Sequence, residues 1–125
     1  MSSVGLVNFI SAFGKLKRIF RTGWLTRGVS KVDVESVAEH VLRTTLISMV
    51  VADFLKSRGI QVNSSLVLKM GLLHDLSEVV LKDIDKEAWI CITPNQKLKH
   101  KTENKAFMEA SGSLPAEIQK DYKKI

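Results

Sequence analysis

The sequence predicts an all-α fold, and three observations lead to that prediction. Glycine and proline are sparse, with seven and two residues in 125, so a β-rich chain with many tight turns is not expected. Apolar residues recur at spacings of three and four in several segments, which is the period of a helix with one buried face. Ser36 and Glu39 form an S-x-x-E capping box, which marks the start of a helix. At this length we expect a single domain over residues 1–125.

The first predicted helix runs from Val4 to about Phe20, where apolar side chains recur at helical spacing. Residues 1–14 carry no charge, but they lack the positive start of a secretory signal and are shorter than the roughly 20 apolar residues that cross a bilayer. We therefore expect a helix that docks on the core and no contact with a membrane. Residues 21–36 lack a helical period and contain Gly23 and Gly28, so they are predicted to be a loop.

The second predicted helix starts at Ser36 and ends near Arg58 and Gly59, since glycine suits the residue after a helix. A third helix, capped by Asn63 or Ser64, contains the stretch 66–83, which reads as one buried helix with a polar end. The apolar pattern of the second helix predicts that its buried side consists of Val37, Val41, Leu42, Thr45, Leu46, Met49 and Val50.

The short connection between these two helices predicts that they pack roughly antiparallel. The start of the second helix then lies beside the end of the third. His40 can therefore meet His74 and Asp75, although 34 positions separate the two histidines. A lone histidine at position 40 is more often a satisfied core residue than a ligand, and this geometry favours the ligand interpretation.

Four titratable groups, His74, Asp75, Glu78 and Asp83, close the third helix. Burial of such groups is costly unless they are paired or bind a metal. On a continuous helix, His74 and Glu78 share one face. Two imidazoles and one carboxylate suit a divalent transition metal such as Mn, Co, Fe, Ni or Zn better than calcium. Glu78 can then orient or deprotonate a water molecule, and Asp83 can assist or hold the leaving group.

The remaining chain is predicted to be less regular over residues 81–97, with a break at Thr93-Pro94-Asn95. A mostly polar helix follows over residues 97–110, with His100 exposed among lysines. Pro115 then occupies the first turn of a last helix over residues 116–124.

The net charge of +6 is unevenly distributed. Residues 15–43 and 97–124 are basic, whereas residues 74–87 hold five acids and two lysines. This pattern suits an anionic substrate beside a bound cation, and a solvated basic surface explains it equally well. Arg21 or Arg27 can hold a phosphate, with surface solvation as the alternative for each. No basic stripe is interleaved with aromatic residues, so nucleic acid is not an expected partner. The single cysteine, Cys91, excludes an internal disulfide and fits a cytoplasmic protein.

Three stretches resemble the HD-domain metal-dependent phosphohydrolases, and in particular their 5′-deoxynucleotidase-like branch. They are LKRIFRTGWLTRG at 16–28, ESVAEHVLRT at 35–44 and LKMGLLHDLSEVVLKDI at 68–84, with a weaker match at 99–107. The combination of S-x-A-E-H with a later H-D-x-x-E-x4-D is far more specific than a histidine-aspartate pair alone. The resemblance covers about residues 15–122.

The resemblance implies an all-α helical bundle that is commonly a dimer, so a homodimer is expected. It implies a divalent metal ion held by His40, His74 and Asp75, a catalytic role for Glu78 and Asp83, and a substrate pocket lined by Arg21 and Trp24. The implied activity is release of phosphate from (deoxy)ribonucleoside 5′-monophosphates.

One departure separates this chain from the family pattern. The family supplies a further metal-ligating aspartate from a helix beyond the Leu-Pro region, and residues 1–125 end before that element. Asp121 lacks the expected setting and is not assigned as a ligand. The expected fold is thus an HD bundle without its usual C-terminal helix or helices. The alternative function is a catalytically degenerate module that binds nucleotide or metal without turnover.

Overall fold

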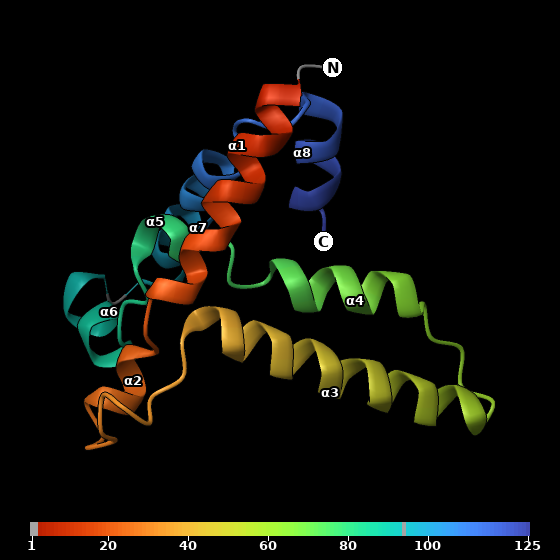
Figure 1. Ribbon diagram of the computed structural model, residues 1–125, viewed down its shortest axis with the longest axis horizontal. Coiled ribbons are helices and arrows are strands. Elements are labelled where there is room, and N and C mark those ends of the chain that lie inside the picture. The colour runs from red at the N-terminus through yellow and green to blue at the C-terminus, as the bar shows by residue number, and fades with distance from the viewer. Residues whose placement is uncertain (1–2, 94) are drawn as a thin grey trace.

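The computed structural model describes residues 3–93 and 95–125, and it confirms the all-α class (Figure 1). Within these residues the only β feature is an isolated antiparallel bridge between Phe20 and Ser36. The helical elements, in chain order, are α1 (Ser3–Gly14), the 3₁₀ helix η1 (Lys15–Arg18), α2 (Thr22–Leu25), α3 (Val37–Ser57), α4 (Ser64–Leu73), α5 (Glu78–Leu81), α6 (Lys86–Ile92), α7 (Gln96–Ala110) and α8 (Ala116–Lys123).

Helices α3 and α4 form an antiparallel hairpin that extends away from the other helices (Figure 1). The predicted capping box is present, because the Ser36 side chain accepts from the Glu39 backbone N–H while the Glu39 side chain accepts from the Ser36 backbone N–H. Asn63 caps α4 through its side chain. The start of α3 and the end of α4 therefore lie side by side at the body of the molecule, as predicted.

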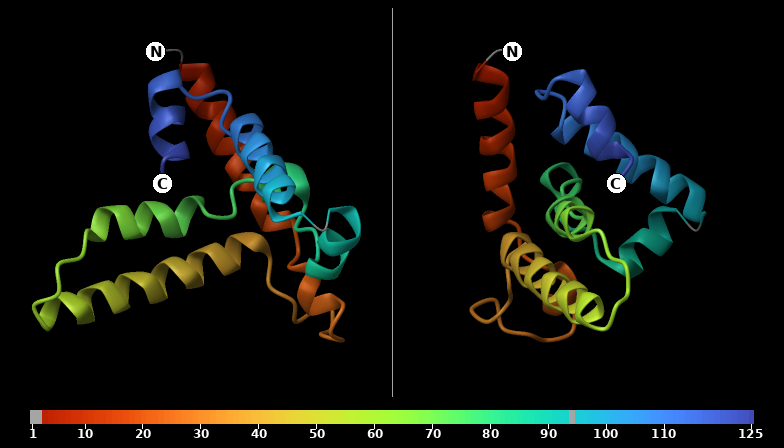
Figure 2. Two further views of the ribbon diagram at one scale, coloured as in Figure 1. Left: turned by 180° about the vertical axis from the view of Figure 1, so that it is seen from behind. Right: turned by 90° about the vertical axis from the view of Figure 1, so that its right-hand side faces the viewer.

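The core lies where η1, the start of α3 and the residues around α5 meet α7 (Figure 2). Leu16, Val37 and Leu76 are fully buried there. Partly buried aromatic side chains of α1 and α7, Phe9, Phe13 and Phe107, pack against this cluster. The cluster holds together the three segments that carry the polar groups of interest.

The N-terminal region differs from its prediction in two ways. The first helix ends at Gly14, where glycine disfavours helix continuation, and the chain tightens into η1 instead of reaching Phe20. The predicted loop 21–36 contains the short helix α2, and hydrogen bonds from Val37 N–H to the Ile19 carbonyl and from Arg21 N–H to the Glu35 carbonyl tie its two ends together.

The predicted single helix over 66–83 is wrong. Helix α4 ends at Leu73, residues 74–77 form tight turns, and α5 follows. The N–H groups of Leu76 and Glu78 bond to carbonyls three residues earlier, so the α-helical register is lost. A spacing of four residues predicts that His74 and Glu78 share a helix face. Because the helix is interrupted between them, they do not.

The predicted buried side of α3 is only partly correct. Val37, Val41 and Thr45 are buried, together with Ala52, but the predicted core residues Leu42, Leu46, Met49 and Val50 are exposed. From Val41 to Leu55 the helix carries only two charged residues, Arg43 and Asp53. A helix that is apolar on all sides has no single preferred face, so its pattern does not identify the face that packs on α4.

The remaining elements follow the predictions more closely. Helices α7 and α8 are confirmed, and Pro115 immediately precedes α8. Helix α6 was not predicted, although the Asp85 side chain caps it. The predicted break near residue 94 falls between α6 and α7, and Pro94 itself lies outside the described residues, as do Met1 and Ser2.

None of the helices in the described ranges combines the length and the apolar character that crossing a membrane requires.

The close approach of α3 and α4 depends on Gly71. A Cβ at this position would lie 2.7 Å from Thr45 Oγ1 and 3.1 Å from its Cα. Gly71→Ala should therefore destabilise the fold by about 1–3 kcal/mol through overpacking, measured as a lower midpoint of urea unfolding. Gly14→Ala is the control, because nothing lies within 4 Å of its Cβ position. Equal midpoints for the two variants would contradict this account.

Candidate metal and substrate site

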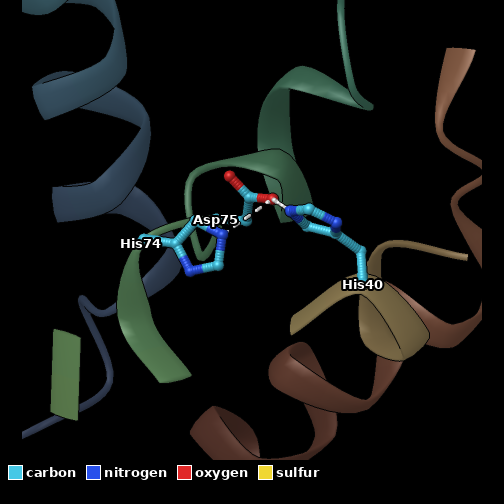
Figure 3. A group of neighbouring side chains, drawn as sticks. All are labelled: His40, His74 and Asp75. Carbon is cyan, nitrogen blue, oxygen red and sulfur yellow. Dashed lines mark ion pairs between the residues drawn. The ribbon is translucent and has the colours of Figure 1, made fainter. Parts of the chain in front are cut away.

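His40, His74 and Asp75 form a group whose ligand atoms all lie within 4.8 Å of one another (Figure 3). His40 comes from the first turn of α3, and the other two residues come from the turn after α4. Asp75 Oδ2 lies 3.6 Å from His40 Nε2 and 3.3 Å from His74 Nε2. The predicted proximity is thus observed, and the group is able to hold a metal ion.

The Nδ1 atom of each histidine contacts an oxygen that can only accept a hydrogen bond. His74 Nδ1 lies 2.7 Å from the Gly71 carbonyl, and His40 Nδ1 lies 3.2 Å from a carboxylate oxygen of Glu35. In each ring the contact at Nδ1 is shorter than the contact of Nε2 with Asp75, so the neutral ring is favoured to carry its proton on Nδ1, with the Nε2 lone pair directed at the shared space beside Asp75. The donor set fits a divalent transition metal because two imidazole nitrogens and one carboxylate oxygen converge.

Arg21 joins this group to Asp83. Its Nη1 lies 3.2 Å from Asp75 Oδ2 and 2.7 Å from Asp83 Oδ1. The other oxygen of Asp83 accepts from the Thr22 backbone N–H at 2.5 Å. Asp83 is only 8% exposed, so these charge-assisted bonds compensate for its burial.

Backbone geometry brings Asp83 to Arg21. Lys82 and Asp83 both have positive φ angles, 64° and 55°, immediately after α5. Two successive non-glycine residues in the left-handed region are costly and persist only where their surroundings hold them. The Asp83 N–H donates to Glu78 Oε2 at 2.6 Å, and this bond stabilises the turn.

The environments of the acids shift their pKa values in opposite directions. Burial acts to raise the pKa of Asp75, but the hydrogen bond from His74 and the charges of His74, Arg21 and His40 outweigh it, so the pKa is lowered. The hydrogen bond to Asp75 raises the pKa of His74. Burial, reinforced by the charges of Asp83 and Asp75, raises the pKa of Glu78 to about 7. Glu78 can thus hold or release a proton near neutral pH.

A cavity of about 640 Å³ opens beside this group, between α2, α6 and the start of α7. Its lining includes Arg21, Trp24, Arg27, Asp75, Glu78 and Asp83. The Trp24 side chain is exposed, and Arg27 forms an ion pair with Glu87 at 3.6 Å. A second cavity of about 330 Å³ is lined by His74 and shares Asp75, Glu78 and Glu103 with the first.

Of the eight residues singled out from the sequence, six line the larger cavity, and the other two, His40 and His74, join them through Asp75. Their functional roles stay predictions. Asp121 lies outside the metal-capable group and pairs with Lys124 at 3.2 Å. Two residues of the site were not predicted from the sequence, Thr22 and Glu35. Thr22 contacts Asp83 because of the turn after α5. Glu35 contacts His40 because of the path of the chain just before α3. No periodic signal marks either residue.

Comparisons with known proteins identify the family of the chain. The model of the HD domain family matches residues 13–125. The chain belongs to the HD-domain family. This HD-domain chain is 32% identical over 120 residues to the mouse protein named 5′-deoxynucleotidase HDDC2, and 29% identical over 116 residues to the fission yeast 5′-deoxynucleotidase hdd1. These alignments cover 96% and 90% of the chain, and 54% and 50% of the relatives. The chain thus spans about half the length of the curated relatives it matches.

Two solved archaeal structures share the fold. A conserved hypothetical protein from Pyrococcus furiosus has a TM-score of 0.70 and 30% identity, with 94% of this chain and 75% of that chain covered. The PH0347 protein from Pyrococcus horikoshii has a TM-score of 0.72 and 29% identity, with coverages of 94% and 72%. These two structures therefore support the fold, and the HD assignment itself rests on the family model.

The raised pKa of Glu78 predicts a pH dependence of stability in the metal-free protein. Because the pKa rises from 4.5 to about 7 on folding, the stabilisation from this proton is fully present below pH 4.5 and is lost as the pH rises through about 7. Glutamine does not titrate, so the Glu78→Gln variant does not lose this stabilisation. Its free energy of unfolding relative to the unsubstituted chain should therefore increase from pH 4.5 to about pH 7 and then level off. Urea unfolding in the presence of a chelator measures the difference.

Glu109, which is exposed on α7, is the control position, because its substitution by glutamine also removes one carboxylate but not a buried one. Glu109→Gln should not reproduce the pH-dependent difference. If the Glu78→Gln difference is constant over the whole range, burial does not shift Glu78 and the pKa assignment is wrong.

Proposed function

We propose that this chain carries the active site of a metal-dependent phosphomonoesterase that acts on nucleoside 5′-monophosphates, including deoxyribonucleotides. The observation that carries the proposal is the convergence of His40, His74 and Asp75 beside a cavity lined by Arg21 and Trp24. The relatives named 5′-deoxynucleotidase support the substrate class.

The cavity offers complementary groups for such a substrate. The Arg21 guanidinium lies at the edge nearest Asp75, where it would bind phosphate oxygens. Arg27 provides a second cation in the same lining, and the exposed Trp24 ring provides a surface on which a base can stack. The three residues predicted from the sequence as substrate contacts thus line one space.

The reaction is hydrolysis: an O–P bond forms from water, the P–O5′ bond breaks, and one proton passes from water to the leaving oxygen. A divalent cation held by His40, His74 and Asp75 would polarise a phosphoryl oxygen and acidify the attacking water. Glu78 is suited to move the proton, because it lines the same cavity and burial raises the pKa of its carboxyl in the metal-free chain.

We assign Asp83 a supporting role. Its two carboxylate oxygens already accept hydrogen bonds from Arg21 and Thr22. We propose that Asp83 fixes Arg21 toward the phosphate, instead of exchanging protons with the substrate itself. The homodimer that the family resemblance implies stays a prediction.

His74→Ala and Asp75→Ala should each abolish metal retention and phosphate release. Both losses should exceed the roughly 10- to 100-fold effects typical of residues that only support metal ligands. The test combines elemental analysis of the purified chain with phosphate release from a panel of 5′-monophosphates in the presence of Mn or Co. His100→Ala is the matched control, because this histidine is exposed on α7.

Full metal occupancy in either variant would overturn the ligand assignment. Stoichiometric metal in the unsubstituted chain without any turnover would instead favour the alternative of a nucleotide- or metal-binding module that lacks catalysis.

Trp24→Ala should weaken substrate binding by about 10-fold and leave kcat nearly unchanged, because base stacking on an aromatic ring contributes about 1–3 kcal/mol in the ground state and the transition state alike. Steady-state kinetics with a deoxynucleoside monophosphate gives both constants. Phe54→Ala removes another exposed aromatic ring, on α3 and away from the cavity, and should change neither constant. A large loss in kcat with unchanged KM would argue against the stacking role.

A further inference from the structure

Glu35 occupies an unusual position just before the start of α3. Its Oε1 lies 3.2 Å from His40 Nδ1, and its Oε2 lies 2.9 Å from Arg43 Nη1. The Glu35 side chain is only 13% exposed, whereas that of Arg43 is 68% exposed. An exposed ion pair alone contributes little, so the ion pair with Arg43 does not account for the burial of this carboxylate.

The contact with Glu35 favours one of the two positions of the proton on the His40 ring. A carboxylate accepts hydrogen bonds and donates none, so it favours the His40 tautomer with hydrogen on Nδ1. That tautomer leaves Nε2 free on the side of Asp75, 3.6 Å from Oδ2. The Gly71 carbonyl has the same effect on His74. In the neutral rings, both contacts therefore favour the tautomer whose Nε2 can bind a metal.

The backbone holds Glu35 firmly in this position. Its carbonyl accepts from the Arg21 N–H at 3.0 Å, and the adjacent Ser36 forms the bridge with Phe20. On the other side, the Val37 N–H donates to the Ile19 carbonyl at 2.7 Å. The segment that orients His40 is thus bound directly to the segment that carries Arg21.

We propose that Glu35 is a positioning residue of the metal site, which orients His40 and fixes its tautomer, with Arg43 holding the second carboxylate oxygen. This inference rests on the proposed metal site. A second carboxylate behind a histidine ligand orients the ring and raises its basicity, and its loss typically lowers metal affinity about 10- to 100-fold.

The first test is the affinity of the chain for Mn or Co, measured by competition with a chromophoric chelator. Glu35→Gln should bind the metal about 10- to 100-fold more weakly. Glu39→Gln is the matched control, because Glu39 lies at the same helix end and glutamine can still complete the capping box. It should bind within about two-fold of the unsubstituted chain.

Arg43→Gln separates the ion pair from the histidine contact. It removes the charge opposite Glu35 but leaves the Glu35–His40 bond available, so it should bind the metal more tightly than Glu35→Gln does. If Arg43→Gln and Glu35→Gln weaken binding equally, the ion pair and not the histidine contact is responsible, and the proposal is wrong.

The second test reads the tautomer directly in the metal-free protein. Long-range ¹H–¹⁵N NMR of the His40 ring at alkaline pH should show one protonated Nδ1 in the unsubstituted chain. The Glu35→Gln variant should show a mixture of tautomers, because an amide can both donate and accept. The dispersion of the remaining signals shows whether this variant is folded. A His40 tautomer that does not change in the folded variant would overturn the proposal.

The two proposals fail in distinguishable ways. If His74→Ala retains full metal, the proposed metal site itself is wrong. If His74→Ala loses the metal while Glu35→Gln binds it with unchanged affinity, the metal site stands and only the positioning role of Glu35 is refuted.

Discussion

The antiparallel packing of α3 on α4 is the constraint on which the site depends. His40 lies at the start of one helix and His74 at the end of the other, so only this orientation brings their rings together. The contact between Gly71 and Thr45 sets how closely the two helices approach, one turn before the histidine-aspartate pair. A parallel arrangement or a wider separation would place the same residues too far apart to share an ion.

The sequence predicts most of what local chemistry determines. The capping box fixed the expected start of α3, and the short connection between the helices predicted the proximity of His40 to His74 and Asp75. The buried face of α3 could not be predicted in the same way. Leu42 and Val50 lie in a segment with only two charged residues, and a periodic pattern identifies a face only where polar residues mark the opposite one.

The parts of the site that the sequence did not predict depend on irregular backbone. The stretch 66–83 has the composition of one helix, yet the turns at 74–77 and the left-handed residues Lys82 and Asp83 direct its acids to different neighbours. Asp83 reaches Arg21, which is 62 positions away. Such pairings arise from tertiary contacts, and neither propensity nor spacing reports them.

The charge arrangement explains why Arg21 has two carboxylate partners. Asp75 Oδ2 contacts Arg21 and lies near the Nε2 atoms of both histidines, so a cation held there would compete with the guanidinium for the lone pairs of the same oxygen. Asp83 Oδ1 lies 2.7 Å from Arg21 Nη1, and this ion pair would keep Arg21 in place whether the guanidinium or a cation contacts Asp75. If a cation takes Asp75, the donors of Arg21 that had faced that oxygen become available to an anion in the adjacent cavity. If the proposed function is correct, the buried Asp83 would therefore allow one arginine to neutralise the site when it holds no ion and to face the phosphate when it does.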